Sequence, residues 1–386
     1  MTFGSRTLLI VCAATCLLVA GCPDKDKTSA QPVDSDPAAS APAASGPASA
    51  AATSILDTPD EGGSCLKPFK TAGDPKELEI AGKKYHLAGD VLSLKSADGD
   101  ETYTLGHLTD VKEDTPENLG NVQLLIKWLH KERADALVVT GDLGESQPSI
   151  ENVMRALAEF KGPVFVMIGN REGITDFEQA FDAVSPALPN LFNMNRVRLF
   201  NADDVSLVSL PGYFNPAYIH SQDGCRYTAD DVHALEAVLK EATATVVIAS
   251  HGPPRQDSIT GIDRIHEGVN VGDPALSRFI GEKRMHFGLF GNIHEAGGKA
   301  TDLGGKEEIR PDTFVDELFL NPGPADSVRW PLLDGTESNG MGGLLTIKGK
   351  KGKFKIRRIR AGEAKPAKAA APASAPAPQP EAPATP

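Results

Sequence analysis

Residues 136–142 read ALVVTGD, and residues 164–170 read VFVMIGN. Each stretch is a short apolar run that ends in glycine and one polar residue, which predicts a buried strand followed by a loop. Apolar residues recur at helical spacing in residues 116–133 and 150–160, ahead of each strand. With a further strand at residues 103–108, this order of strands and helices indicates an α/β domain with a sheet covered on both faces.

The flanking segments extend the same pattern. Residues 78–95 alternate apolar and polar residues and predict short antiparallel strands. The other predicted elements are strands at residues 196–200, 205–210, 245–250, 286–290 and 317–320, a helix at 232–242 with a cap at Thr228 and Asp231, and a closing hairpin of residues 343–347 and 354–359.

Five of the predicted strands are followed by side chains that can bind metals, namely Asp110, Asp142, Asn170, His251 and His294. Taken alone, each has an ordinary explanation, such as a turn, a helix cap or a loop. Because the carboxyl ends of strands form one edge of an α/β sheet, we expect the five groups to converge on one crevice. Two divalent ions about 3.5–4 Å apart could there hold a phosphate and activate a water.

The ordered set resembles the calcineurin-like metallophosphoesterase superfamily. The family motifs D-x-H, G-D-x-x-D/E, G-N-H-D/E, a histidine at a strand end and G-H-x-H correspond to residues 110–112, 141–145, 169–172, His251 and residues 291–294. A family loop also matches residues 321–323 (NPG), and the resemblance covers residues 103–359. One motif alone is a weak signal, whereas five in the family's order are specific.

This resemblance implies an α/β fold of the metallophosphoesterase type, a four-layer sandwich in which two mixed β-sheets are flanked by helices. It implies hydrolysis of a phosphoester, with a phosphodiester compatible, by one or two divalent ions (Mn, Fe or Zn). The implied partner is a phosphate-bearing substrate or ligand. The implied metal ligands are Asp110, Asp142, Asn170, His251, Asn292 and His294.

Three positions depart from the family pattern. Lys112 replaces a histidine that binds the first ion, and Asn292 replaces a histidine that binds the second. Arg171 replaces the histidine that the family uses to protonate the leaving group or to steady the phosphate. Arginine keeps its proton near neutral pH but can bind phosphate oxygens in pairs, so Arg171 and Lys112 are the candidates for steadying charge during catalysis.

These departures affect the two ion positions unequally. At the first position an ammonium at Lys112 would neutralise the carboxylates of Asp110 and Asp142 and repel a divalent ion. The second position is better preserved, because it keeps Asp142, Asn170 and His251 and can use the weaker carbonyl oxygen of Asn292. A centre with one metal ion, in which Lys112 stands in for the other, is therefore chemically coherent.

Three functions remain open at this point. The first is a phosphoesterase at the cell envelope. The second is a pseudoenzyme or binding module on the same fold, with a reduced or absent metal centre. The third is a scaffold with no ion, which would leave the ordered strand-end ligands unexplained.

The two ends of the chain read as processing and linker segments. Residues 1–21 combine Arg6 with a short apolar run and resemble a bacterial lipoprotein signal, which implies lipidation of Cys22 and a membrane anchor. The alternatives are an ordinary signal peptide and an uncleaved anchor. Residues 22–60 and 361–386 are rich in Ala and Pro and predict a tether and a disordered tail, which leaves 61–360 as the domain.

Charge and cysteine content complete the sequence evidence. The formal net charge of -13 argues against binding of a nucleic-acid backbone. Cys65 and Cys225 are the two cysteines left in the domain, and an exported protein would allow them to pair, although two free thiols remain the alternative.

Overall fold

The computed structural model describes residues 64–367. The predicted signal peptide, the predicted lipidation site Cys22 and the predicted tether lie outside the described residues, as does the predicted tail beyond residue 367. Those assignments therefore stay predictions.

The first sheet has six strands in the order β17-β16-β4-β5-β6-β7. Strands β4 to β7 run parallel, and β16 pairs antiparallel with both β4 and β17. The bounds are β4 Thr102–Leu108, β5 Ala136–Val139, β6 Val164–Val166, β7 Leu191–Asn193, β16 Met341–Lys348 and β17 Lys351–Arg358.

The second sheet has nine strands in the order β1-β2-β3-β8-β9-β10-β11-β13-β12. It is also mixed, because β9, β10, β11 and β13 run parallel while β12 and the N-terminal strands are antiparallel to a neighbour. The bounds are β1 Lys76–Ile80, β2 Lys83–Ala88, β3 Val91–Leu94, β8 Leu199–Asn201, β9 Val205–Leu210, β10 Thr245–Ser250, β11 Phe287–Leu289, β12 Lys299–Thr301 and β13 Leu318–Asn321. A separate short pair consists of β14 (Trp330–Pro331) and β15 (Glu337–Ser338).

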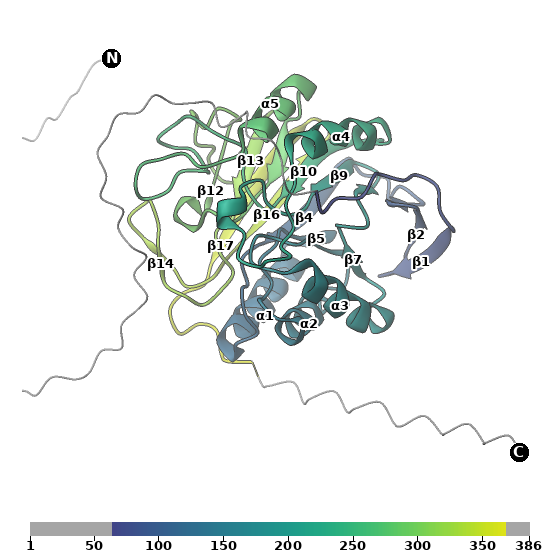
Figure 1. The fold of residues 1–386 in the computed structure, drawn as a ribbon, viewed down its shortest axis with the longest axis horizontal. Helices are drawn as coiled ribbons and strands as arrows, with labels where there is room; N and C mark the ends of the chain where they lie inside the picture. Colours follow the sequence, from purple (N-terminus) through teal and green to yellow (C-terminus); the bar gives the residue numbers. More distant parts are fainter. Residues whose placement is uncertain (1–63, 368–386) are drawn as a thin grey trace, which may run out of the picture. The chain divides into compact units, whose positions relative to one another are not determined.

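Helices cover the outer face of each sheet, as Figure 1 shows. Three helices, α1 (Pro116–Lys131), α2 (Gln147–Leu157) and α3 (Ile174–Val184), lie on the six-stranded sheet, and two helices, α4 (Ala229–Lys240) and α5 (Pro274–Lys283), lie on the nine-stranded sheet. Three apolar clusters fill the spaces between these layers: one under α1 to α3, one between the sheets and one under α4 and α5. The prediction of a four-layer α/β sandwich is confirmed.

Local sequence explains where the predicted helices begin. The Thr115 hydroxyl accepts a hydrogen bond from the Asn118 N–H (3.2 Å), and Pro116 occupies a first-turn position that needs no donor. At α4 the Thr228 and Asp231 side chains form the predicted reciprocal capping box. No prediction from the sequence covers α3, α5 or the short strands β7 and β12.

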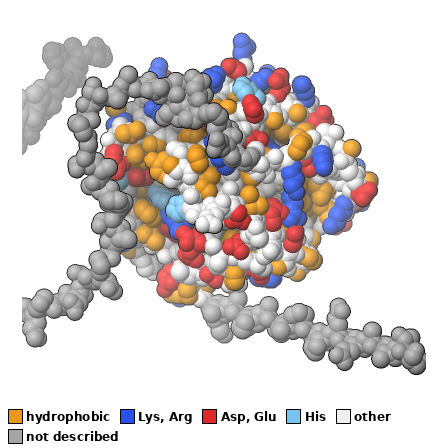
Figure 2. Space-filling model, viewed as in Figure 1, with side chains coloured by type: hydrophobic (Ala, Val, Ile, Leu, Met, Phe, Trp, Pro, Cys, Tyr) orange, Lys and Arg blue, Asp and Glu red, His pale blue; other side chains and the backbone are white. Residues whose placement is uncertain are grey.

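Charged side chains of both signs are mixed over the surface of the described part. Figure 2 shows Lys and Arg side chains interspersed with Asp and Glu over the visible face. Between residues 64 and 367, no helix combines the length and the apolar character needed to span a bilayer.

Candidate metal centre

Strand ends from both sheets meet at one place. The segments after β4, β5 and β6 come from the six-stranded sheet, and the segments after β10 and β11 come from the nine-stranded sheet. Backbone hydrogen bonds join them within each sheet: Asp110 N–H donates to the Gly141 carbonyl (3.1 Å), and Gly291 N–H donates to the His251 carbonyl (2.8 Å). Contacts between the sheets join His251 Nδ1 to the Thr140 carbonyl (2.7 Å) and His294 Nε2 to Asp110 Oδ1 (3.0 Å), so the predicted convergence of the strand-end motifs is present.

The backbone of these segments is strained. Among the described residues, eight other than glycine have a positive φ, and four of them are in these motifs: Asp110, Lys112, Asp142 and Asn292. A left-handed conformation costs such residues about 1 kcal/mol or more. Strain of this kind concentrates where a fold must aim side chains at one point, which is what these three segments do.

Two glycines permit the close approach of the strand ends. Gly141 has a φ of +91°, and a Cβ atom there would lie 2.7 Å from His251 Nδ1. A Cβ atom at Gly169 would overlap Asp142 Oδ1. Both motif glycines are therefore required by the space around Asp142 and His251.

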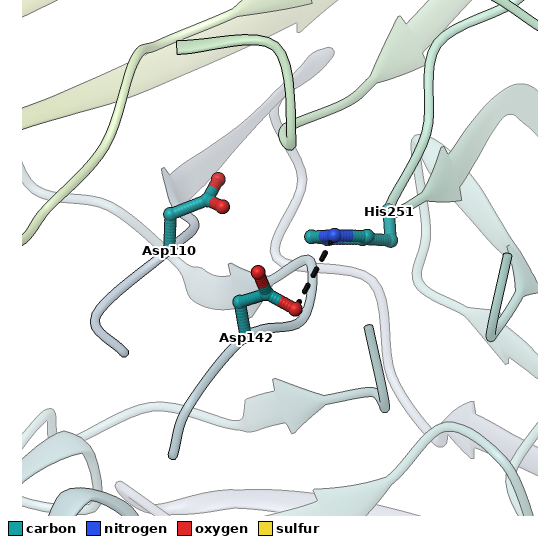
Figure 3. Close-up of side chains that lie close together, drawn as sticks. All are labelled: Asp110, Asp142 and His251. Atoms are coloured by element: carbon teal, nitrogen blue, oxygen red, sulfur yellow. Dashed lines mark ion pairs between the residues drawn. The ribbon is translucent and has the colours of Figure 1, made fainter. Parts of the chain in front are cut away.

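Three of the predicted ligands form a compact buried cluster. Asp110, Asp142 and His251 each offer one ligand atom, and these atoms all lie within 4.8 Å of one another. Figure 3 shows the carboxylates of Asp110 and Asp142 on one side and the imidazole of His251 facing Asp142. All three side chains are buried. Two carboxylates and an imidazole are donors that a divalent transition metal accepts.

The contacts of the two ring nitrogens of His251 indicate whether a cation can bind beside it. Its Nδ1 lies 2.7 Å from the Thr140 carbonyl oxygen, which can only accept, so Nδ1 carries a proton. Its Nε2 lies 2.9 Å from Asn170 Oδ1 and 3.3 Å from Asp142 Oδ1. The Asn170 amide is oriented this way because its Nδ2 donates to the Tyr218 carbonyl (2.7 Å).

Nε2 of His251 therefore faces two acceptor oxygens. A neutral imidazole with its proton on Nδ1 cannot satisfy them, so either a second proton or a cation must lie between these atoms. Burial opposes a charge on His251, but the attraction of Asp142 and Asp110 outweighs it and raises the pKa of the imidazole. Burial also raises the pKa of Asp142. The donor set Asp142, Asn170 and His251 fits a divalent ion.

The first ion position is arranged differently. His294 Nε2 lies 3.0 Å from Asp110 Oδ1, while Asp110 Oδ2 accepts from the Thr109 hydroxyl (2.7 Å) and the Asn292 N–H (3.0 Å). Burial raises the pKa of Asp110, but His294, His251 and Lys112 together hold it well below its usual range. Asp110 is thus a carboxylate whose oxygens both have donors.

Lys112 points to a partner that sequence reasoning missed. Its Nζ lies 3.1 Å from Asp326 Oδ2 and 4.0 Å from the centre of the Trp330 ring. Its ion pair is with this buried third carboxylate, whereas the expectation was direct neutralisation of Asp110 and Asp142. The difference arises because Asp326 lies beside the Asp110 loop, although the two are far apart in sequence.

Arg171 and Asn292 also have partners outside the cluster. The Arg171 guanidinium forms an ion pair with Glu145, and the Arg171 backbone N–H donates to Asp142 Oδ1 (3.2 Å). The Asn292 side chain lies near Tyr213, whose ring packs edge-on to the His251 ring at 6.0 Å. The side chains of Lys112 and Arg171 are thus already paired with carboxylates.

Glu172 supports the backbone around the cluster through hydrogen bonds. It is fully buried, and its two carboxylate oxygens accept from the Leu143 N–H and from the Gly169 N–H (2.9 Å). Burial, with a smaller contribution from Asp142, raises its pKa to about 7. Glu172 therefore supports the site through these hydrogen bonds, whereas Glu145 is exposed.

A disulfide supports the loop over Asn170. The structure joins Cys65 to Cys225, with a Cα–Cα distance of 5.2 Å. The Cys225 carbonyl accepts from the Tyr213 N–H (2.9 Å), and the His220 N–H donates to the Asn170 carbonyl (2.9 Å). The loop that orients Asn170 is therefore tied to the N-terminal end of the domain.

Comparison with known proteins agrees with this architecture. The profile of the calcineurin-like phosphoesterase family matches residues 103–296, about half of the chain. No curated protein matches the sequence. One crystal structure, 14% identical, covers 67% of this chain and 100% of its own with a TM-score of 0.50, which shows a shared fold.

Two further solved structures are more distant. The protein TT1561 of Thermus thermophilus is 15% identical over 67% of this chain and 100% of its own, with a TM-score of 0.47. A dimetal phosphatase from Danio rerio is 14% identical over 67% of this chain and 99% of its own, with a TM-score of 0.40. The family profile and the fold together establish that the chain belongs to the calcineurin-like phosphoesterase family.

Proposed function

We propose that this protein is a divergent metal-dependent phosphoesterase whose main ion position is formed by Asp142, Asn170 and His251. One observation carries the proposal: His251 Nε2, with its ring oriented by the Thr140 carbonyl, faces two buried acceptor oxygens. A divalent ion at this position supplies Lewis-acid polarisation of a phosphoryl oxygen. Mn, Fe and Zn all accept this donor set.

The residues of the chain have distinct parts in this proposal. Thr140 fixes the tautomer of His251, and the Tyr218 carbonyl fixes the amide of Asn170, so that both donors are preorganised. Arg171 binds the phosphate: Glu145 occupies one end of its guanidinium, while its buried Nε has no hydrogen-bond partner among the described residues. Arg171 orients the substrate and does not act as an acid.

A second candidate, a phosphate-binding module without turnover, is favoured by a specific observation. Both cations expected to steady a developing charge are already paired with carboxylates, Lys112 with Asp326 and Arg171 with Glu145. A substrate phosphate must compete with these partners, which weakens its contact with each cation. Such a site would bind a phosphate-bearing ligand at the metal and release it unchanged.

The test measures turnover in the full chain, purified in detergent and loaded with Mn²⁺. Hydrolysis of p-nitrophenyl phosphate and of bis-p-nitrophenyl phosphate is expected, and it should fall about 100-fold or more in Asp142→Asn and His251→Ala. His233→Ala, an exposed histidine on α4, is the matched control and should retain activity. No hydrolysis by a chain that holds the metal and binds inorganic phosphate would favour the second candidate.

We also propose that the protein acts at the bacterial cell envelope, anchored by lipid on Cys22. The support is the lipoprotein-like order of Arg6, the apolar run and the Ala-Gly-Cys end of residues 1–22. Mass spectrometry of the mature N-terminus should find an acylated cysteine, and Cys22→Ser should leave the membrane fraction. An unmodified Cys22 in a cleaved or uncleaved chain would contradict the anchor.

A further inference from the structure

We propose that Asp326 and Trp330 hold Lys112 as a built-in cation beside Asp110, so that this centre takes one divalent ion and not two. The inference rests on the proposed function, because it concerns the same site. Neither Asp326 nor Trp330 belongs to any motif recognised in the sequence, and both lie beyond residues 103–296, which the family profile matches.

The contacts of the Lys112 ammonium define a closed cluster. Nζ lies 3.1 Å from Asp326 Oδ2 and 4.0 Å above the Trp330 ring. Trp330 Nε1 in turn donates to both oxygens of Asp326, each at 3.1 Å. Asp326 is fully buried and Lys112 is 7% exposed, so solvent screens this pair little. The three side chains, here called the Lys112 cluster, satisfy one another.

The carboxylate of this cluster is fixed to the site by backbone. The Asp326 N–H donates to the Asp110 carbonyl (3.1 Å), and the preceding Ala325 N–H donates to the Thr109 carbonyl (2.9 Å). The buried Asn121 side chain donates to the carbonyls of both Ala325 and Asp326 (3.2 and 3.1 Å). These hydrogen bonds fix the position of Asp326 relative to the Asp110 loop, and its ion pair in turn fixes the position of Lys112 relative to Asp110.

Trp330 also connects the Lys112 cluster to His294. The rings of Trp330 and His294 lie 4.5 Å apart, and His294 Nε2 hydrogen-bonds Asp110 Oδ1 (3.0 Å). Asp110 thus has a donor on each oxygen without any ion. The position around Asp110 is complete as a set of protein groups, whereas His251 Nε2 faces two acceptor oxygens.

The charge of Lys112 limits the number of divalent ions that the centre can bind. An ion near Asp110 would meet a fixed ammonium on the same loop and would have to break the His294 hydrogen bond. The position at Asp142, Asn170 and His251 lies on other loops than Lys112, and an ion there replaces the hydrogen bond between His251 Nε2 and Asn170 Oδ1. Lys112 is therefore a specificity-determining residue that sets the number of ions, and Asp326 and Trp330 are positioning residues that act through it.

The test measures the number of Mn²⁺ ions bound per chain. The full chain is purified in detergent, equilibrated with Mn²⁺ and passed through a desalting column, and its metal and protein contents are then measured by elemental analysis and protein quantitation. The wild type should retain one Mn²⁺ per chain, and Asp142→Ala should retain none. Lys112→His removes the fixed ammonium and adds an imidazole beside Asp110, so it should retain two. Lys127→His, an exposed position on α1, adds a histidine elsewhere and should retain one.

The outcomes separate the two proposals. Two ions in the wild type would overturn the single-ion inference and leave the proposed function standing. No ion in a folded wild type would overturn the proposed function and the inference with it. If Lys112→His does not fold, the double variant Lys112→His with Asp326→Asn can be used, because it removes both charges of the pair. It should also retain two ions. A single ion in either variant, once folded, would overturn the role assigned to Lys112.

Discussion

Replacing Asp326 with Asn removes the buried charge that pairs with Lys112 while it keeps the shape of the side chain. The Lys112 ammonium would then lie in a buried site with only an amide oxygen and the Trp330 ring beside it. At 3.1 Å and an effective dielectric constant of about 20, Coulomb's law gives an attraction of roughly 5 kcal/mol. Breaking a buried pair by removing one partner costs about 3–5 kcal/mol.

We therefore expect Asp326→Asn to lower the free energy of unfolding by about 3–5 kcal/mol, measured by urea denaturation followed by tryptophan fluorescence. Asp316→Asn is the matched control: it removes the partner of Lys351 from an exposed pair and should change stability by less than about 1 kcal/mol.

A cycle with Lys112→Met isolates the pair. The double variant Lys112→Met with Asp326→Asn should be more stable than Asp326→Asn alone, because no unpaired charge remains buried. A loss below about 1 kcal/mol for Asp326→Asn would refute the reasoning, since it would mean that Lys112 reaches solvent or another carboxylate.

Three other predictions concern the surroundings of the site. Gly169→Ala places a Cβ against Asp142 Oδ1 and should weaken Mn²⁺ binding about 10-fold or more by calorimetry, whereas Gly281→Ala, which meets only a Leu303 methyl at 3.6 Å, should not. Cys225→Ser should lower the free energy of unfolding by about 2–5 kcal/mol and abolish the effect of reductant on stability; an unchanged response to reductant would contradict it. Burial lowers the pKa of His107 from 6.5 to about 3. The contribution of neutral His107 to the free energy of unfolding is therefore complete above pH 6.5 and is lost as the pH falls towards 3, with a loss of about 2 kcal/mol at pH 5. His107→Gln should therefore show a shallower fall in stability between pH 7 and 5.

The sequence predicted those features whose signal is local. A short apolar strand followed by glycine and a ligand residue occupies about seven positions, so the segments ending at Asp142 and Asn170 could be placed without any knowledge of the fold. The spacing that would predict α3 was also present, since Phe177, Phe181 and Val184 recur at helical intervals and are buried. Strands of three residues such as β7 carry too little pattern to stand out.

The partners of the site residues could not be predicted in the same way. Asp326 and Lys112 are more than two hundred positions apart, and only the layering of the sheets brings them together. Tyr213 reaches His251 and Asn292 from a loop that the disulfide supports. The sequence therefore predicted which groups converge. The structure shows which of them are already paired, and that His251 Nε2 faces two acceptor oxygens.

The most direct test of the central claim is the anomalous diffraction of Mn²⁺ in crystals of the full chain grown or soaked with that ion. We expect one strong peak at about 2.0–2.2 Å from His251 Nε2 and Asp142 Oδ1, and no peak between Asp110 and His294. Well-ordered crystals with no peak at His251, or with a peak only at another place, would contradict it.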